Sequence, residues 1–224
     1  MHKLRHLFII FLLVTGQITL EAQNNEFKAG LRAGHNAAFG QFAAASIESN
    51  QYIYKDISIN GGVQYNTIGK TSLEAHPSYD FRFDWGKLTA ETIFAYINFS
   101  SINSFSIGAG AKAYLGKMSA KLGYFYHQFG RKGEKITEPV NFYYELCAYL
   151  LQKNENWDLR LLLTNCELFE LERQYQPSFI AECSHNLSTN LEFIIGLGYK
   201  PSGVFCISAD YYQTFIKTGI CYRW

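Results

Sequence analysis

The last nine residues, 216–224, read IKTGICYRW, and they decide the fold. Alternate positions in this stretch carry Trp224, Tyr222, Ile220, Thr218 and Ile216. The positions between them include the charged residues Arg223 and Lys217. Successive side chains of a β-strand point to opposite faces, so this alternation is typical of a strand with one apolar face and one polar face. The chain therefore ends in an amphipathic strand whose final residue is aromatic.

The same two-residue period recurs along the chain from residue 26 onward. In SLEAHPSYDFRF, residues 72–83, one parity is apolar or aromatic, and the other carries Glu74, His76, Asp80 and Arg82. Short polar stretches separate such segments, as they do between paired strands. The pattern predicts about twelve strands, at 26–35, 39–53, 57–67, 70–83, 87–99, 103–115, 117–129, 140–152, 157–165, 176–187, 190–199 and 213–224.

The connections between these segments alternate in length. Tight turns such as 54–56, 84–86 and 115–117 fall on one side of the predicted sheet, whereas the long connections Gly130–Asn141, Glu167–Gln176 and Pro201–Gln213 fall on the other. Bacterial outer-membrane barrels have short periplasmic turns and longer outer loops. The sequence therefore predicts an all-β protein, a closed antiparallel up-and-down transmembrane β-barrel of about twelve strands, with ten or fourteen as alternatives.

The N-terminus has the pattern of an export signal. Lys3 and Arg5 precede the short apolar run LFIIFLLV, residues 7–14, and Ala22 offers a cleavage point. A charged start, a short apolar core and a small residue at the cut are typical of a secretory signal peptide. We expect residues 1–22 to be a cleaved signal and residues 23–224 to form a single barrel domain.

The polar parity of the predicted strands holds equal numbers of positive and negative charges. In a membrane barrel this parity lines the lumen and the apolar parity faces lipid. A soluble secreted sandwich, which has the same alternation, is the alternative. The predicted lumenal charge network consists of eight cations and eight carboxylates: Lys28, Arg32, Arg82, Lys112, Lys121, Arg160, Lys217, Arg223, Glu48, Glu74, Asp80, Glu91, Glu145, Asp158, Glu182 and Glu192.

The ends of the strands favour the membrane barrel. Trp85, Trp157 and Trp224 all fall at the short-turn rim, where aromatic residues anchor barrels at the membrane interface. The terminal stretch IKTGICYRW resembles the C-terminal assembly signal of bacterial outer-membrane β-barrels, carried here by Ile216, Ile220, Tyr222 and Trp224. This resemblance implies transient recognition by the barrel-assembly machinery and insertion into the outer membrane of a Gram-negative bacterium. Outer-membrane lipids and lipopolysaccharide are then the expected surroundings.

The sequence contains one cluster of candidate catalytic residues. His76 and Ser78, with Glu74 and Asp80, share the polar parity of one strand, an arrangement similar to the His-x-Ser of outer-membrane phospholipases and lipid A deacylases. Residues two apart on a strand lie about 6–7 Å apart, too far for a direct Ser–His contact. His127 lacks a serine two residues later, since Phe129 stands there. No spacing of ligands resembles a metal site, and we expect neither metal nor cofactor.

Bulk composition narrows the possible functions. The 224 residues carry 20 Lys and Arg against 19 Asp and Glu, which excludes the basic footprint of a nucleic-acid binder. Because buried charges persist when they are paired, the balanced lumenal charges predict a plugged barrel with a structural, adaptor or surface-interaction role rather than an enzymatic one. A narrow channel for a small solute is the first alternative, and an envelope-lipid hydrolase is the second.

Overall fold

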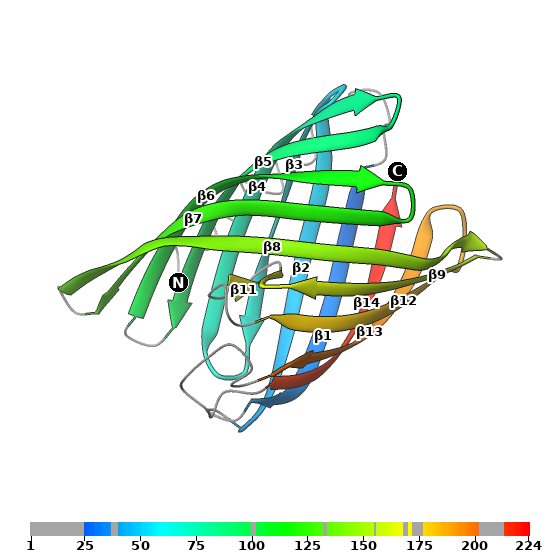
Figure 1. Cartoon of the computed structure of the whole chain (residues 1–224). Coiled ribbons are helices and arrows are strands. Elements are labelled where there is room, and N and C mark those ends of the chain that lie inside the picture. The colour runs from blue at the N-terminus through cyan, green and yellow to red at the C-terminus, as the bar shows by residue number, and fades with distance from the viewer. Residues whose placement is uncertain are drawn as a thin grey trace.

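The computed structural model describes residues 25–36, 40–99, 102–131, 134–154, 156–167, 170–171, 177–201 and 213–224. The predicted signal peptide lies outside the described residues. Alternating side chains give strands throughout (Figure 1), and these are β1 Glu26–Asn36, β2 Gly40–Tyr54, β3 Ile57–Asn66, β4 Lys70–Phe83, β5 Gly86–Phe99, β6 Ile102–Leu115, β7 Met118–Arg131, β8 Glu134–Asn154, β9 Trp157–Thr164, β10 Cys166–Glu167, β11 Glu170–Leu171, β12 Ser178–Asn186, β13 Leu191–Lys200 and β14 Gln213–Arg223.

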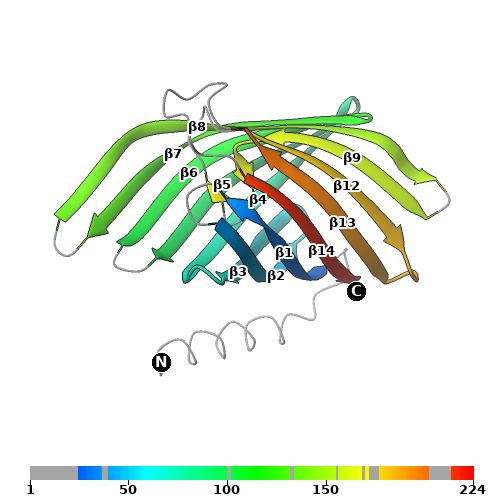
Figure 2. The ribbon, with the colours of Figure 1, turned by 90° about the horizontal axis from the view of Figure 1, so that it is seen from below.

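Twelve of these strands form one closed antiparallel barrel, in the order β1-β14-β13-β12-β9-β8-β7-β6-β5-β4-β3-β2. The last strand closes the barrel by pairing with the first, from Glu26 opposite Arg223 to Asn36 opposite Gln213. Closure leaves no strand edge whose backbone groups lipid could not satisfy. The predicted fold class and strand number are confirmed, and Figure 2 shows the same strands seen from below.

One predicted outer loop is wrong over most of its length. Residues 130–141 were expected to be irregular, but β7 continues to Arg131 and β8 begins at Glu134. The β7–β8 ladder passes through a register shift between Phe125 and His127 and then continues. The shift places two β8 residues, one of them Pro139, opposite a single β7 residue, and proline lacks the amide hydrogen that a ladder needs. The residues that predicted a loop here instead form a bulge inside a long hairpin.

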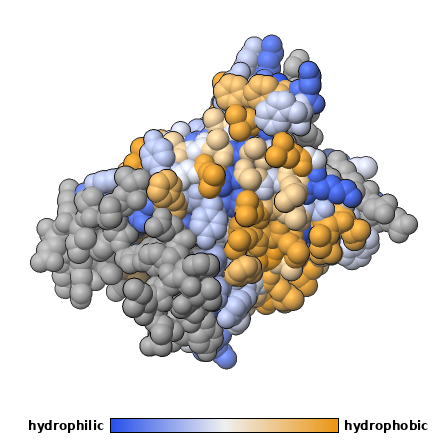
Figure 3. All heavy atoms as spheres, in the orientation of Figure 1, coloured by the Kyte–Doolittle hydropathy of each residue, from blue (hydrophilic) through white to orange (hydrophobic). Residues whose placement is uncertain are grey.

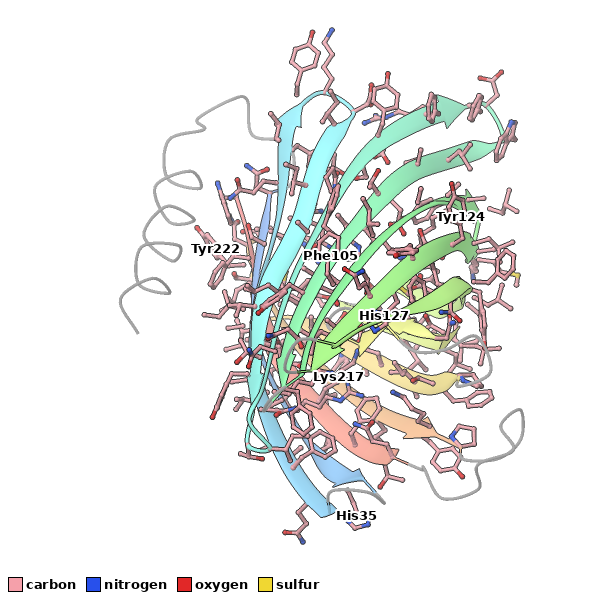
Figure 4. The ribbon with its side chains drawn as sticks, turned by 90° about the vertical axis from the view of Figure 1, so that its left-hand side faces the viewer. His35, Phe105, Tyr124, His127, Lys217 and Tyr222 are labelled. Atoms are coloured by element: carbon pink, nitrogen blue, oxygen red, sulfur yellow. The ribbon has the colours of Figure 1, made fainter. Side chains whose placement is uncertain are left out.

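The apolar parity forms the outer skin of the barrel. Leu31 on β1 is 65% exposed and Leu122 on β7 is 68% exposed. Figure 3 shows apolar side chains gathered over the visible wall, and Figure 4 shows Tyr222 on the outer side. The carboxylates of Glu74 and Glu182, on the other parity, are buried inside. The orientation predicted from the sequence, with apolar side chains outward and ionic ones inward, is confirmed.

A short hairpin lies inside the ring of strands. After β9 the chain turns so that Cys166 packs with Ile93, Phe125 and Tyr143 in a lumenal cluster. The hairpin of β10 and β11 follows at once (Figures 1 and 2). The side chain of Asn165 holds this turn, because its Oδ1 accepts from the Tyr144 amide at 2.7 Å and its Nδ2 donates to the Phe142 carbonyl at 2.9 Å. These hydrogen bonds satisfy the Tyr144 amide and the Phe142 carbonyl of β8 at the level where β9 ends.

Within the part of the chain described, no helix is both long enough and apolar enough to cross a membrane.

Candidate functional site in the barrel lumen

The lumen contains two adjoining cavities. The larger has a volume of about 380 Å³ and the smaller about 350 Å³. They share lining residues from the middle of the barrel, among them Lys28, Lys112, Arg160 and Glu182. The smaller cavity also includes Arg223, beside the C-terminus, so it lies toward the rim that carries both termini. Side chains thus narrow the lumen but leave space along it.

Two ion pairs stand at the centre of the wall formed by β5 to β8. Lys112 Nζ lies 2.7 Å from Glu145 Oε1, and Lys121 Nζ lies 3.0 Å from Glu91 Oε1. The hydroxyl of Tyr143 donates to the same Glu91 carboxylate at 3.1 Å. All four charged side chains are at most 19% exposed. Charges buried to this extent require partners of opposite sign, and each of them has one.

A second group of ion pairs joins β9, β12, β13 and β14 to β1. Glu182 contacts both Arg160 and Lys217, the latter at 2.7 Å. Nearer the terminal rim, Arg223 Nε donates to Glu26 at 2.8 Å, and its Nη2 contacts Glu192. The last strand is therefore tied by charge to both of its neighbours, in addition to its backbone ladder. The carboxylate of Glu26 was not included in the predicted network.

The remaining members of the predicted network lie in different surroundings. Asp80 accepts from Thr89 at 2.6 Å and from Lys87 at 3.2 Å, and Lys87, a cation, was also not included in the predicted network. Arg82 lies at the rim rather than among the lumenal pairs, with its side chain 69% exposed and 3.3 Å from Asp56. The others face the lumen: Lys28 lies 3.7 Å from Glu26, Glu48 accepts from Ser46, Arg32 covers Phe215, and Asp158 lines the smaller cavity.

The predicted catalytic candidates share the lumenal face of β4 but not the contacts that catalysis needs. His76 Nε2 lies 2.9 Å from Glu74 Oε2. The hydroxyl of Ser78 lies 2.8 Å from that of Ser58 on β3, so its hydrogen bond goes to a second serine. Asp80 is held by the partners named above. The pairing of β4 with β5 is also interrupted opposite His76, next to Pro77. Glu74 and His76 therefore contact each other, whereas Ser78 and Asp80 bond to residues outside the cluster.

A serine–histidine pair occurs elsewhere, and the sequence reasoning missed it. Ser106 Oγ lies 2.7 Å from His127 Nδ1, across the β6–β7 ladder, where the two residues are directly opposite. Only the register could have revealed it, because the residues are 21 apart in sequence. Ser106 is 1% exposed, so its hydroxyl is closed to a bulky lipid. Among the described residues, no group of three or more His, Cys, Asp or Glu could hold a metal ion.

The β5–β8 side of the lumen is densely packed. The ring of Tyr143 is fully buried and lies against Gly110 and Gly123, where any side chain would collide with it. Cys166 covers the same cluster from the inward-turned hairpin. Burial raises the pKa of the Cys166 thiol to about 12, so this thiol stays protonated and unreactive at neutral pH. The opposite side, around β1 and β14, borders the larger cavity.

The terminal rim carries the residues predicted to anchor and assemble the barrel. Trp85 lies in the β4–β5 turn, Trp157 begins β9, and Trp224 follows β14, all with exposed side chains. Tyr222 stacks with Trp224, at 6.0 Å between ring centroids. Trp157 packs against His185 on the outer face, at 4.3 Å. Ile216 and Ile220 are exposed on the same face. Their roles as an interfacial girdle and an assembly signal stay predictions.

Solved structures with the same architecture are outer-membrane barrels. The chain is similar to the KdgM porin in complex with disordered oligogalacturonate, with 13% identity, 87% of this chain and 98% of that chain covered, and a TM-score of 0.57. It is similar to the translocator domain of the autotransporter NalP from Neisseria meningitidis, with 12% identity, coverage of 99% and 96%, and a TM-score of 0.57. An outer membrane channel from Pseudomonas putida F1 has 8% identity, coverage of 92% and 97%, and a TM-score of 0.58.

At these identities the likeness shows the fold, and the fold defines the class. The chain is a twelve-stranded outer-membrane β-barrel. No protein-family model matches the sequence. No curated protein matches it either.

Proposed function

We propose that the protein is a narrow channel that passes a small solute across the outer membrane. The observation that carries this proposal is the pair of adjoining ionic cavities, whose volumes of about 380 and 350 Å³ fall within the range of about 300–1,000 Å³ found for small-molecule sites. Two of the similar structures reported above are a porin and an outer membrane channel. Both the fold and the space inside it therefore favour transport over a purely structural role.

The positions of the ion pairs around the barrel also support an open path for a solute. Lys121 and Glu91 join β7 to β5, Lys112 and Glu145 join β6 to β8, and Glu182 on β12 reaches β9 and β14. Each pair joins strands that are adjacent or separated by one strand, so the pairs run along the wall. Barrels of about eight strands are filled by their side chains, and those of about sixteen hold an aqueous channel. Twelve strands give a lumen between these limits.

Planar-bilayer recording of the purified protein tests the proposal. We expect small, steady conductance steps, together with swelling of liposomes in a monosaccharide but not in a large oligosaccharide. The same preparation unfolded by boiling serves as the control, because it retains the sequence and the detergent but loses the lumen. If folded protein, verified by its heat-modifiable migration on a gel, gives no steps and no swelling, the channel is refuted and the structural or adaptor role is favoured.

The outer surface supports a membrane location for this activity. Apolar side chains such as Leu31, Leu122 and Phe142 are each at least 60% exposed, which water would penalise and lipid would not. We infer that outer-membrane lipids cover this belt and that lipopolysaccharide meets the rim opposite the termini. The predicted surface loop 201–213 lies outside the described residues except at its ends.

A further inference from the structure

Three carboxamide side chains lie on the lumenal face of two neighbouring strands. Asn50 on β2 is directly opposite Asn60 on β3, and Gln64 follows on the same face of β3. All three residues line the larger cavity. Residues two apart on a strand are separated by about 6–7 Å. Because Asn60 and Gln64 are four residues apart, the amides stand at successive depths along the lumen.

Gln64 is the most enclosed of the three residues, and only 7% of it is exposed. Within the part of the chain that the structure describes, its side-chain amide has no hydrogen-bond partner. Its ladder neighbours Ser46 and Ser72 supply none, since the Ser46 hydroxyl donates to Glu48 at 3.4 Å and the Ser72 hydroxyl makes no bond among the described residues. Neither polar atom of the Gln64 amide is sealed from the cavity. A buried amide without a partner is destabilising, so this one is available to a molecule that enters.

The amides of Asn50 and Asn60 are also unused. Both residues are half-buried and directly opposite each other, but their amides bond neither to one another nor to any other described group. Tyr52, two residues after Asn50 on the same face, adds an aromatic ring to the lining. Small-molecule sites combine such apolar surface with a few convergent polar groups. The wall formed by β2 and β3 therefore has free hydrogen-bonding capacity.

The charged side chains of the same cavity are occupied. The ion pairs are Lys87 with Asp80, Lys121 with Glu91, Lys112 with Glu145, and Glu182 with both Arg160 and Lys217. Lys28, Arg32 and Glu48 have partners as well. A charged solute would have to displace one of these partners and leave a charge uncompensated. An uncharged solute can bind the free amides and leave every ion pair intact.

We propose that Gln64, together with Asn50 and Asn60, forms a binding subsite for an uncharged sugar or polyol. The inference rests on the proposed function as a channel, and it names the chemical class of the solute. A carboxamide carries two N–H donors and a carbonyl acceptor, and a hydroxyl group both donates and accepts, so one amide can bind two neighbouring hydroxyls of a sugar.

Three solutes of one ring size test the chemistry. In planar bilayers, we expect glucose to reduce the ion current through the wild type in the millimolar range, because a bound sugar occupies the lumen. Permethylated glucose keeps the ring and loses the hydroxyl donors, and glucuronate adds a carboxylate. Both are expected to bind at least about tenfold more weakly than glucose, which is the factor expected from the loss of one or two neutral hydrogen bonds.

Two variants locate the subsite. Gln64→Met keeps the length of the side chain and removes the amide, and it is expected to weaken the glucose block about tenfold. Asn60→Leu is expected to weaken the block severalfold. The matched control is Gln51→Met, since Gln51 lies on the same sheet with the opposite parity, opposite the exposed Ile59, and its block is expected to equal that of the wild type. If either lumenal variant is blocked like the wild type, or if glucuronate or permethylated glucose binds as tightly as glucose, the subsite is refuted.

A stability measurement separates binding from a structural role of Gln64. The temperature of the heat-modifiable gel shift is expected to be no lower for Gln64→Met than for the wild type, because the amide that is removed has no partner within the described barrel. A marked fall in this temperature would show that the amide stabilises the barrel itself and would overturn the assignment.

Equilibrium dialysis of the folded protein in detergent against radiolabelled glucose separates failure of the subsite from failure of the channel. Millimolar binding that Gln64→Met weakens supports the subsite even if the wild type gives no conductance, in which case the channel alone is refuted. Steady conductance without glucose block, and without binding in dialysis, overturns the subsite and leaves the channel in place.

Discussion

Replacement of Glu182 by glutamine is expected to lower the free energy of unfolding by about 2–3 kcal/mol. Glu182 is 5% exposed in its side chain and contacts both Arg160 and Lys217. Removing one partner of a fully buried ion pair costs about 3–5 kcal/mol, because the other charge is left uncompensated. Arg160 and Lys217 are 35% and 24% exposed in their side chains, so water in the cavities offsets part of this cost, and the expected loss lies below that range.

Urea titration of the barrel in one detergent, followed by tryptophan fluorescence and by the heat-modifiable gel shift, measures this loss. The rim pair of Asp56 and Arg82 gives the control, since the Arg82 side chain is 69% exposed. Exposed pairs contribute about 0–1 kcal/mol, so Asp56→Asn is expected to change stability by no more than about 0.5 kcal/mol. Equal, small effects of Glu182→Gln and Asp56→Asn would refute the view that lumenal charge pairing stabilises the barrel.

Four further outcomes are expected. Tyr143→Ala empties the centre of the packed side and is expected to raise single-channel conductance, whereas an unchanged conductance would place the constriction elsewhere. Deleting Trp224 is expected to reduce the amount of folded barrel in outer-membrane fractions severalfold, as quantified by gel shift, with total synthesis unchanged. Leu122→Arg, in the lipid-facing belt, is expected to cost about 2–4 kcal/mol by urea titration, while the same change at the rim costs little. The wild type is expected to release no fatty acid above background from phospholipid or lipopolysaccharide, and Ser106→Ala is expected to give the same result. Measurable release by the wild type that Ser106→Ala abolishes would instead establish a hydrolase.

The fold was predictable because a barrel is specified by a local rule. The alternation of apolar and polar residues along each strand predicts which side chains share a face. The terminal stretch 216–224 indicates that the apolar face is the outer one. Strand limits followed closely, and the exception at 130–141 has a physical cause. A bulge beside Pro139 breaks the alternation by one residue and looks like the start of a loop, although the ladder resumes beyond it.

The site was less predictable because its partners are set by register. The alternation along the strands predicted that Glu182 and Lys217 face the lumen. Nothing in the sequence indicates that Glu182 forms ion pairs with both Lys217 and Arg160. Ser106 and His127 meet because β6 and β7 pair with one particular offset, and a shift of two residues would separate them while leaving every face unchanged. Composition therefore predicts that the lumenal charges are balanced in number, whereas the identity of the charges that meet depends on the ladder.

The same lumenal composition is compatible with a plugged barrel and with a channel, and the difference lies in where bulk and charge are placed around the ring. On β5 to β8, Tyr143 and Phe125 fill the lumen, and the lysines there have one carboxylate each. At the β1–β14 seam, glycines replace bulk, and Arg32 faces Lys217. Because β1 and β14 stand at opposite ends of the chain, no local pattern predicts this juxtaposition, and it exists only when the barrel is closed. Closure, which membrane insertion requires, therefore also brings Arg32 and Lys217 together in the lumen.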